Sequence, residues 1–391
     1  MRICAQVFHF LLHRTSTSER IRHITIKPSL TIDDIARELG VSKTTVSRAI
    51  SGKGRISAAT RERVQAYIEE HNYKPNASAK SLAESKTYNL ALALPREFIK
   101  LDIPFVRQSM SAIVDEAYTL GYNVMLCLDD NTESTALSRI LDYRKVDGVI
   151  LTRTVEDDHL VEMLNKRGIP FATLGSLPLK YEGTAVVQAD HDHVGGCCAF
   201  SRAVLAGSDA PTALLGNDLN YIVNQNRLSG FRKACQELVI PLTRTPLRMG
   251  INDLEGCREA VAALLAQGVR RFLCMDEDVC TRTMTVLRDN GLSIPGDAQV
   301  ASFSDTDQIR NAQPPVSALS FDSAELARAA CREFIHALND DSYDPKPLLG
   351  YKVRLRQSMI SLFERLQMQP PAIFRKTHPL SRGEGGRRPG E

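Results

Sequence analysis

The chain has 391 residues, of which 43% are hydrophobic and 24% charged, and its formal net charge is +3. No stretch approaches the roughly 20 consecutive apolar residues that a membrane-spanning helix needs. Nine cysteines without a C-x-x-C pair exclude a disulfide scaffold and are typical of a protein of the reducing cytoplasm.

The first 26 residues have only a faint likeness to a signal peptide. One arginine precedes an apolar run, but Gln6, His9 and His13 interrupt that run, and no small-residue cleavage site follows. We therefore expect residues 1–26 to be a poorly ordered extension, for which an over-long choice of start codon is one explanation.

Residues 31–50, TIDDIARELGVSKTTVSRAI, predict two short amphipathic helices joined by a tight turn. Thr31 is a good N-cap for the first helix, and apolar residues recur at helical spacing up to Gly40, which can adopt the left-handed conformation that ends a helix. Ser42 caps the second helix, which runs from Lys43 to about Ile50. The pattern is that of a helix-turn-helix, although two short helices around a glycine also occur in ordinary helical bundles.

The second helix of this pair has a polar outer side, formed by Lys43, Thr44, Ser47 and Arg48. The major groove of DNA admits one helix, and these residue types can contact base edges there. Because the N-terminal part of such a helix does most of the reading, Lys43 and Thr44 are the predicted base readers. Arg48, one turn further, is expected to reach a guanine or a phosphate.

A third helix is predicted after Ser57, with Val64, Tyr67 and Ile68 on its inner side. Residues 27–86 contain 11 Lys and Arg against 7 Asp and Glu, a net charge of +4. This sign suits a module that faces phosphates.

Residues 73–87, YKPNASAKSLAESKT, predict a break at Pro75 and Asn76 followed by a short, weak helix at 77–83. A helix of this length is marginal alone and needs a partner to fold against.

These segments resemble the LacI/GalR family of bacterial repressors. The residues that match its signature are Thr31, Asp34, Ile35, Ala36, Gly40, Val41, Ser42, Thr45, Val46, Ser47 and Arg48, followed by Tyr73, Pro75, Asn76, Ala79 and Leu82 in the hinge. The resemblance extends, more loosely, to about residue 360.

The resemblance implies that two hinge helices, one per subunit, fold together on the operator, and that Leu82 wedges into the minor groove and kinks the duplex. The alternative is that Leu82 is a linker residue that packs on the large domain. The DNA-binding residues implied are Thr31, Ser42, Lys43, Thr44, Thr45, Ser47, Arg48, Asn76, Ala79, Lys80 and Leu82.

From Tyr88 onward, short apolar segments alternate with amphipathic helical segments, and this order predicts parallel sheets covered by helices on both faces. The predicted strands are 89–95, 123–129, 147–152, 171–175, 185–190, 212–216, 270–276 and 299–304, and the predicted helices include 107–120, 134–143, 223–238 and 322–339. About 270 residues are too many for one simple sheet, so two doubly wound lobes are expected.

The fold class predicted is therefore an all-α helix-turn-helix head plus an α/β domain. The resemblance implies that this domain is periplasmic-binding-protein-like, with a small-molecule cleft between its two lobes. We expect lobe one at about 88–190 plus 304–320, and lobe two at about 191–303 plus 321–360.

Candidate effector-binding residues follow from the same resemblance. Arg227 lies in an R-x-x-G-F element and is the candidate that anchors a ligand hydroxyl or carboxylate, the alternative being a surface arginine of an ordinary helix. Asp276 and Glu277 occupy the positions of the family's usual Asn and Asp, and both departures indicate an unusual effector or a reshaped pocket. A carboxylate after a strand suits sugar hydroxyls.

Two further candidates are Phe105, at an aromatic position that can line the cleft, and Asp190, for which a structural role at a lobe crossover is an equal alternative. The run Asp190, His191, Asp192 and His193 hints at a metal site, but adjacent residues on one chain rarely point at a common ion. No catalytic constellation is found, so no metal, no cofactor and no enzymatic activity are predicted.

The domain boundaries predicted are an extension at 1–26, the DNA-binding head at 27–73, the hinge at 74–87, the two-lobed domain at 88–360 and a tail at 361–391. The tail is rich in Gly, Pro and Arg and is expected to be disordered. Its arginines either add weak DNA affinity or have no role.

The sequence predicts a cytoplasmic transcriptional regulator, a repressor of a carbohydrate-utilisation operon. Its partners would be double-stranded operator DNA with a near-palindromic site, a second copy of the chain in a homodimer, and a small polar effector such as a sugar, sugar acid or sugar phosphate. The alternative is a sugar-binding sensory module whose head has lost specific operator recognition.

Overall fold

The computed structural model describes residues 30–52, 54–73, 81, 84–96, 103–129, 135–185, 187–206, 208–340 and 348–359. They form two units that divide between Ser85 and Lys86. The predictions for residues 1–26 and 361–391 fall outside the described residues. The same holds for the hinge positions Asn76, Ala79, Lys80 and Leu82.

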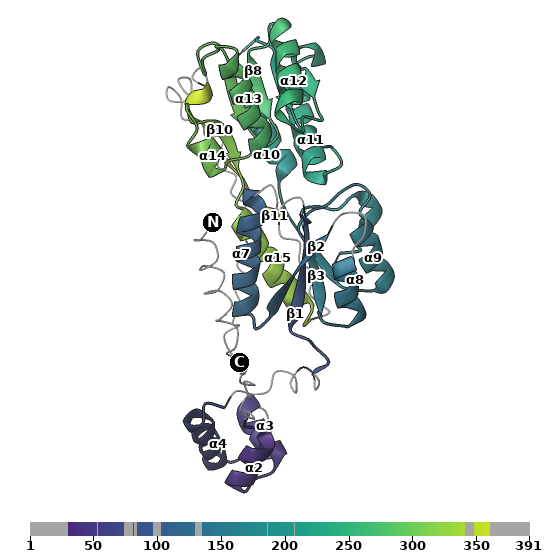
Figure 1. Cartoon of the computed structure of the whole chain (residues 1–391), viewed down its shortest axis with the longest axis vertical. Coiled ribbons are helices and arrows are strands. Elements are labelled where there is room, and N and C mark those ends of the chain that lie inside the picture. The colour runs from purple at the N-terminus through teal and green to yellow at the C-terminus, as the bar shows by residue number, and fades with distance from the viewer. Residues whose placement is uncertain are drawn as a thin grey trace, which may run out of the picture. The chain divides into compact units, whose positions relative to one another are not determined.

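The first unit contains the helices α2 (Ile32–Leu39), α3 (Lys43–Ser51) and α4 (Ala58–Glu70) (Figure 1). The predicted N-caps are confirmed: the side chains of Thr31, Ser42 and Ser57 each accept a hydrogen bond from a backbone N–H of the first turn. Gly40 ends α2 in the left-handed conformation, at φ 62°. The fully buried residues of this small core are Ile35, Val46 and Val64.

The first sheet of the second unit has the strand order β11-β5-β4-β3-β1-β2, and all of its pairings are parallel. Its strands are β1 (Asn89–Pro95), β2 (Asn123–Asp129), β3 (Gly148–Leu151), β4 (Phe171–Leu174), β5 (Val187–His191) and β11 (Leu348–Leu349). The helices α7 (Pro104–Thr119) and α15 (Ser323–Ala337) cover one face, and α8 (Thr135–Asp142) and α9 (His159–Arg167) cover the other (Figure 1).

The second sheet has the strand order β12-β10-β9-β8-β6-β7, in which only β12 is antiparallel. Its strands are β6 (Thr212–Leu215), β7 (Leu247–Arg248), β8 (Arg271–Cys274), β9 (Gln299–Ser302), β10 (Ser317–Ser320) and β12 (Lys352–Arg354). The helices α10 (His193–Leu205) and α11 (Ile222–Glu237) pack on one face, and α12 (Leu254–Ala266) and α13 (Glu277–Asp289) on the other. The short helix α14 (Asp307–Arg310) and the 3-10 turns η1 (Leu179–Tyr181), η2 (Leu242–Arg244) and η3 (Gln357–Met359) complete the described elements.

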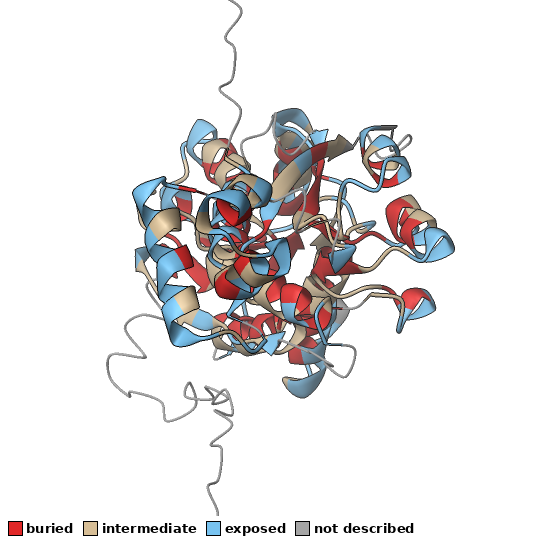
Figure 2. Ribbon diagram, turned by 90° about the horizontal axis from the view of Figure 1, so that it is seen from below, coloured by how far each residue is buried: buried red, intermediate tan, exposed pale blue. Residues whose placement is uncertain are grey.

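Both sheets confirm the predicted pair of doubly wound lobes. In each sheet the first strand lies between the second and the third, so the winding direction reverses beside the first strand. The eight strands predicted from apolar runs are all present, shifted by at most a few residues at their ends. Figure 2 shows the buried residues, in red, gathered along the strands and on the inner sides of the helices.

The predicted division of the chain between the lobes is wrong in its C-terminal part. Residues 317–320 form β10, which pairs with β9 and therefore belongs to lobe two, not to lobe one. The helix α15 belongs to lobe one, because its apolar side, with Ala330 and Phe334, is buried in the core beneath α7. The chain thus passes between the lobes near residues 192, 321 and 350, and not near 304.

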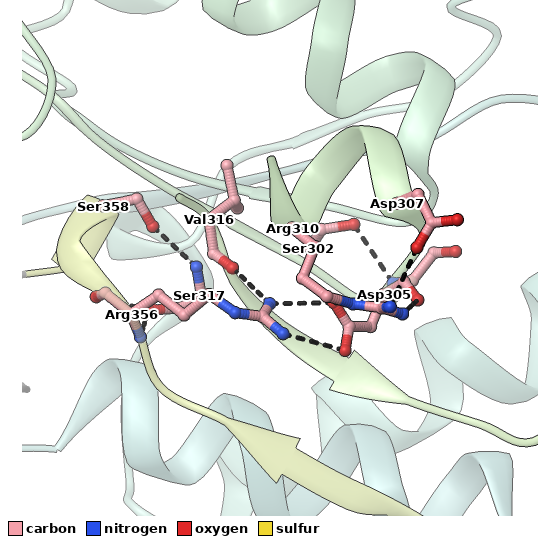
Figure 3. Close-up of polar contacts among 9 residues, drawn as sticks. Ser302, Asp305, Asp307, Arg310, Val316, Ser317, Arg356 and Ser358 are labelled. Atoms are coloured by element: carbon pink, nitrogen blue, oxygen red, sulfur yellow. Dashed lines mark hydrogen bonds and ion pairs between the residues drawn. The ribbon is translucent and has the colours of Figure 1, made fainter. Parts of the chain in front are cut away.

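The last crossing returns the chain to lobe two, where polar contacts hold β12 and the turn after it (Figure 3). The guanidinium of Arg356 forms an ion pair with Asp305, at 2.8 Å between Nη1 and Oδ1. It also donates a hydrogen bond to the backbone carbonyl of Val316 at 2.7 Å. The hydroxyl of Ser358 accepts from the Ser317 N–H at 2.8 Å. These contacts anchor the end of the described chain to the start of β10 and to the loop after β9.

The eight cysteines among the described residues are buried and free, as expected for small apolar residues of a core. Burial raises the pKa of the Cys331 thiol to about 12, so this thiol is protonated at neutral pH. Over the described ranges, no helix is both long enough and apolar enough to cross a membrane.

Candidate functional site

The outer side of α3 presents the predicted base-reading residues to solvent. Ser42, Lys43, Thr44, Ser47 and Arg48 are all exposed, whereas Thr45 is half-buried. The Thr45 hydroxyl lies 2.9 Å from that of Ser42, so it shares in the helix cap. The arrangement places a polar helix face, free of apolar side chains, where a groove of DNA can receive it.

Contacts within the head orient two of these residues. The ammonium group of Lys43 forms an ion pair with Asp33 of α2, at 2.5 Å between Nζ and Oδ1. The stem of Arg48 lies over Gly54, where a Cβ atom would come within 3.0 Å of the arginine Cδ. Gly54 also has a φ of 87°, which favours glycine. Thr31 forms a capping box with Asp34, and its hydrogen bonds lower the pKa of that carboxyl group.

In lobe two, polar side chains meet at the carboxyl ends of β6 and β8, where the winding direction of the sheet reverses. Ligands of open α/β sheets bind at this kind of position. Asn217 follows β6 and donates a hydrogen bond to the Asp276 carboxylate at 2.7 Å. Its side-chain oxygen accepts one from Asn224 of α11, also at 2.7 Å. Asn217 and Asn224 were not among the candidates, although an Asn directly after a strand was a signal that could have found the first.

Arg227 comes from the next turn of α11. Its Nη1 donates to the backbone carbonyl of Met275 at 2.7 Å, and its Nε is buried without a hydrogen-bond partner among the described residues. The side chain is half-buried, so Arg227 is not the fully exposed arginine of the alternative interpretation. Burial raises the pKa of Asp190 and of Asp276 and lowers that of His193; the Arg227 charge opposes the rise at the two carboxyl groups and adds to the fall at His193.

Asp276 is the N-cap of α13, where its Oδ1 accepts from the Val279 N–H at 2.8 Å. Burial raises its pKa from 3.8 to about 6. Glu277, the next residue, is half-buried in the first turn of the same helix. Phe105 lies in the first turn of α7, where its half-buried side chain packs against the core of lobe one.

Asp190 is the last residue but one of β5 and is almost fully buried. Its Oδ2 accepts hydrogen bonds from the backbone and the hydroxyl of Ser176, at 2.9 and 2.5 Å. Its Oδ1 accepts from the His191 N–H at 2.8 Å and lies 3.4 Å from His193 Nε2. These hydrogen bonds fit the structural interpretation of Asp190, and its role in binding an effector stays a prediction.

Asp190 also lines a cavity of about 540 Å³ beside this crossover. Glu156, the loop 176–180 and Leu348 contribute from lobe one, and Val194, Ile222, Gln225 and Asn226 contribute from lobe two. Arg227, Asp276, Glu277 and Phe105 do not line it. Among the predicted effector residues, Arg227, Asp276 and Glu277 thus lie near the ends of β6 and β8, Asp190 lines this cavity, and Phe105 lies apart from both on α7.

The three crossings between the lobes contact one another next to the cavity. The ring of Phe321 lies 5.1 Å from that of His191 and 4.4 Å from that of His193, measured between ring centroids. The Asp192 N–H donates to the Leu349 carbonyl at 3.0 Å. Side chains and backbone of all three crossings therefore form one connected cluster.

A separate set of hydrogen bonds joins the lobes between residues 154–156 and 220–225. The Ile222 N–H donates to Thr154, the Glu156 N–H donates to Asn220, and the Gln225 amide donates to the Glu156 carboxylate. No group of three or more His, Cys, Asp and Glu side chains within the described ranges has the arrangement of a metal site.

The comparisons with known proteins agree with this architecture. Residues 31–76 match the family model described as bacterial regulatory proteins of the lacI family, and residues 211–359 match a periplasmic binding protein-like domain. The HTH-type transcriptional regulator DegA of Bacillus subtilis is 28% identical over 74% of this chain and 86% of its own.

Two solved structures share the fold over most of the chain. The complex of the transcriptional regulator CelR with cellobiose matches with a TM-score of 0.64 and 24% identity, over 84% of this chain and 99% of its own. The lac repressor dimer bound to operator and the anti-inducer ONPF matches with a TM-score of 0.67 and 23% identity, over 85% of this chain and 99% of its own.

Proposed function

The chain belongs to the LacI family of bacterial regulatory proteins, and on this basis we propose that it is a sequence-specific DNA-binding transcriptional regulator that acts in the cytoplasm as a repressor. A small sugar-like effector bound between its two lobes controls it, and a carbohydrate-utilisation operon is its target. No enzymatic step is part of this function.

The exposed polar face of α3 is the observation that carries the proposal. Lys43, Thr44, Ser47 and Arg48 stand on a helix whose start is fixed by the Ser42 cap and whose inner side is fixed by Val46 in the core. A helix so held can enter the major groove with its N-terminal residues at the base edges.

The proposal for the effector rests on the lobes and on the relatives. A CelR structure is a complex with cellobiose, and a lac repressor structure contains an anti-inducer. The polar groups of Asn217, Arg227 and Asp276 at the ends of β6 and β8 offer both donors and acceptors to a hydroxylated ligand. A ligand that binds one angle between the lobes better than another shifts the protein towards that angle.

The first experiment selects DNA from sheared genomic fragments with the purified full-length protein and sequences what is retained. We expect a short near-palindrome beside genes of carbohydrate utilisation. Uniform, salt-sensitive retention without a common motif would instead support a sensory module without operator recognition.

The second experiment exchanges the base readers. Replacement of Lys43 and Thr44 by alanine should change the preferred half-site in the same selection, because these side chains are expected to contact bases and not only phosphates. The control is Lys166→Ala on the exposed side of α9, which removes the same charge far along the chain. A uniform fall in affinity with an unchanged half-site would show that the assignment of base readers is wrong.

A further inference from the structure

The cavity beside the lobe crossings has a chemistry that the function proposed above does not assign. Both His191 and His193 line it, and their side chains are almost fully buried, with 4% and 8% of their surface exposed. Each ring has one nitrogen with no hydrogen-bond partner among the described residues, Nε2 in His191 and Nδ1 in His193. Buried polar atoms usually have a hydrogen-bond partner, so these two nitrogens indicate a ligand or water that would donate to them.

Both unpaired nitrogens are hydrogen-bond acceptors. The His191 ring makes a hydrogen bond to the Asp322 backbone, so the ring donates from Nδ1 and its Nε2 carries a lone pair. The His193 Nε2 lies 3.4 Å from the Asp190 carboxylate, so a proton on Nε2 faces that carboxylate and Nδ1 carries the lone pair. Burial is the largest influence on both rings; it lowers the pKa of His191 to about 4 and that of His193 well below 6.5, so both are neutral near pH 7.

The charged groups of the cavity are also mainly acceptors. Three carboxylates line it, those of Glu156, Asp190 and Asp192, against the single ammonium group of Lys180. Lys180 already forms an ion pair with Asp157. Arg227 does not line the cavity, and its Nη1 donates a hydrogen bond to the Met275 carbonyl. The cavity therefore repels anions and favours a donor-rich ligand.

Asp192 is the carboxylate best able to accept from such a ligand. The oxygens of Asp190 are both engaged by Ser176 and His191. Asp192 is half-buried, and its Oδ1 caps α10 through the Gly195 N–H at 2.7 Å, which leaves Oδ2 without a hydrogen bond to any residue that the structure describes. Asp192 lies at the first crossing, where its N–H donates to Leu349 of lobe one and its carbonyl accepts from the Gly196 N–H of lobe two.

We propose that this cavity binds a small molecule that carries a primary ammonium group, with the ammonium held by the Asp192 carboxylate and with Glu156 and the two histidines as further acceptors. A volume of about 540 Å³ is within the range of small-molecule sites. Sugar acids and sugar phosphates are excluded by the charge of the lining. Binding of the ammonium ligand does not depend on the proposed function. An effect of this ligand on DNA binding does rest on the proposed function, in which a ligand that contacts both lobes controls the head.

The test is isothermal calorimetry on the full chain without DNA, with four probes: glucosamine, putrescine, glucose and glucose 6-phosphate. We expect binding of glucosamine, of putrescine, or of both, and the pattern distinguishes an amino sugar from a polyamine. Glucose and glucose 6-phosphate should bind at least about tenfold more weakly, since they lack the charge-assisted hydrogen bond.

Asp192→Asn should weaken binding of the ammonium probe roughly tenfold, because Asn keeps the helix cap and loses only the charge. Glu156→Gln, at an exposed position, should weaken it less. The matched control is Asp253→Asn: Asp253 caps α12 through the Gly256 N–H at 2.8 Å in the same way and does not line the cavity.

Two results would overturn the inference: neither ammonium probe binds, or glucose binds as tightly as glucosamine with no loss in Asp192→Asn. DNA binding is measured separately by fluorescence anisotropy on the selected fragments. A protein that binds its DNA site but no ammonium probe refutes only the inference about the cavity, and a protein that binds the probe but no specific DNA refutes only the proposed function.

Discussion

The carboxyl group of Asp276 caps α13 and at the same time accepts a hydrogen bond from Asn217. Its position at the end of a predicted strand indicates a carboxylate that suits sugar hydroxyls. In the folded protein, burial raises the pKa of this carboxyl group from 3.8 to about 6. A carboxyl group in this state costs free energy when it is charged, and a ligand that donates a hydrogen bond to it would reduce that cost.

The pH dependence of stability should reveal this group. Because its pKa is raised in the folded state, its stabilising contribution is fully present below about pH 4 and is lost as the pH rises through about 6. The free energy of unfolding of the wild type, relative to Asp276→Asn, should fall by on the order of 1 kcal/mol between about pH 5 and pH 7.5. Urea unfolding at the two pH values measures it, with Asp253→Asn as the control for loss of an N-cap aspartate. A constant difference between wild type and variant would show that Asp276 is not buried as described.

Two elements illustrate how differently helices and strands of this chain are determined. The recognition helix α3 has its cap, its buried residues and its end within ten residues of sequence, so its bounds could be predicted closely. The strand β12 has three residues and pairs with β10, more than thirty positions earlier in the chain. Just beyond it, Arg356 reaches Asp305, whose side chain is only 3% exposed, and this ion pair helps to hold the strand in place.

Removal of the Arg356 charge should therefore be costly. Arg356→Met leaves Asp305 buried and poorly paired, and we expect a loss of about 2–3 kcal/mol in the free energy of unfolding, since breaking a buried pair costs more than breaking an exposed one. Arg310, which approaches the same carboxylate at 3.7 Å but has a side chain that is 50% exposed, is the matched control (Figure 3). Arg310→Met should cost less than about 1 kcal/mol. Equal losses in urea unfolding would contradict the special role of Arg356.

At the scale of the whole molecule, the two lobes are joined by three crossings that contact one another through Phe321, the two histidines and the backbone of Asp192. A change in the angle between the lobes must be taken up within these few residues and in the bonds between 154–156 and 220–225. A ligand in the cavity touches the first crossing directly. Through these contacts, a ligand bound between the lobes would change the angle between them.

On the proposed function each head reads one half-site, so the full chain should require two copies and two half-sites. We expect a DNA fragment with one half-site to bind at least about 100-fold more weakly than the near-palindrome, because the second head then binds intramolecularly. Fluorescence anisotropy with the two fragments measures the ratio, and sedimentation of the complex should give two chains per palindrome. One chain per palindrome, with equal affinity for both fragments, would contradict the homodimer.

The sequence by itself determined the head and the strands of both lobes. Thr31, Gly40, Ser42 and Ser57 act through contacts with residues three or four positions away, and such contacts can be read from the chain directly. The apolar runs of β1 and of the other predicted strands identify buried strands, because parallel sheets are covered on both faces.

Only the tertiary structure decided how the segments combine. Whether β10 joins the first or the second sheet depends on pairing with β9 and on the burial of α15 beneath α7, and both contacts link residues that no local pattern connects. The same holds for the site: Asn217, Asn224 and Asp276 meet from three separate segments, and the cavity of His191 and His193 exists only because two lobes close on it. Burial and long-range contacts set these features, and they follow from the folded arrangement of the whole domain.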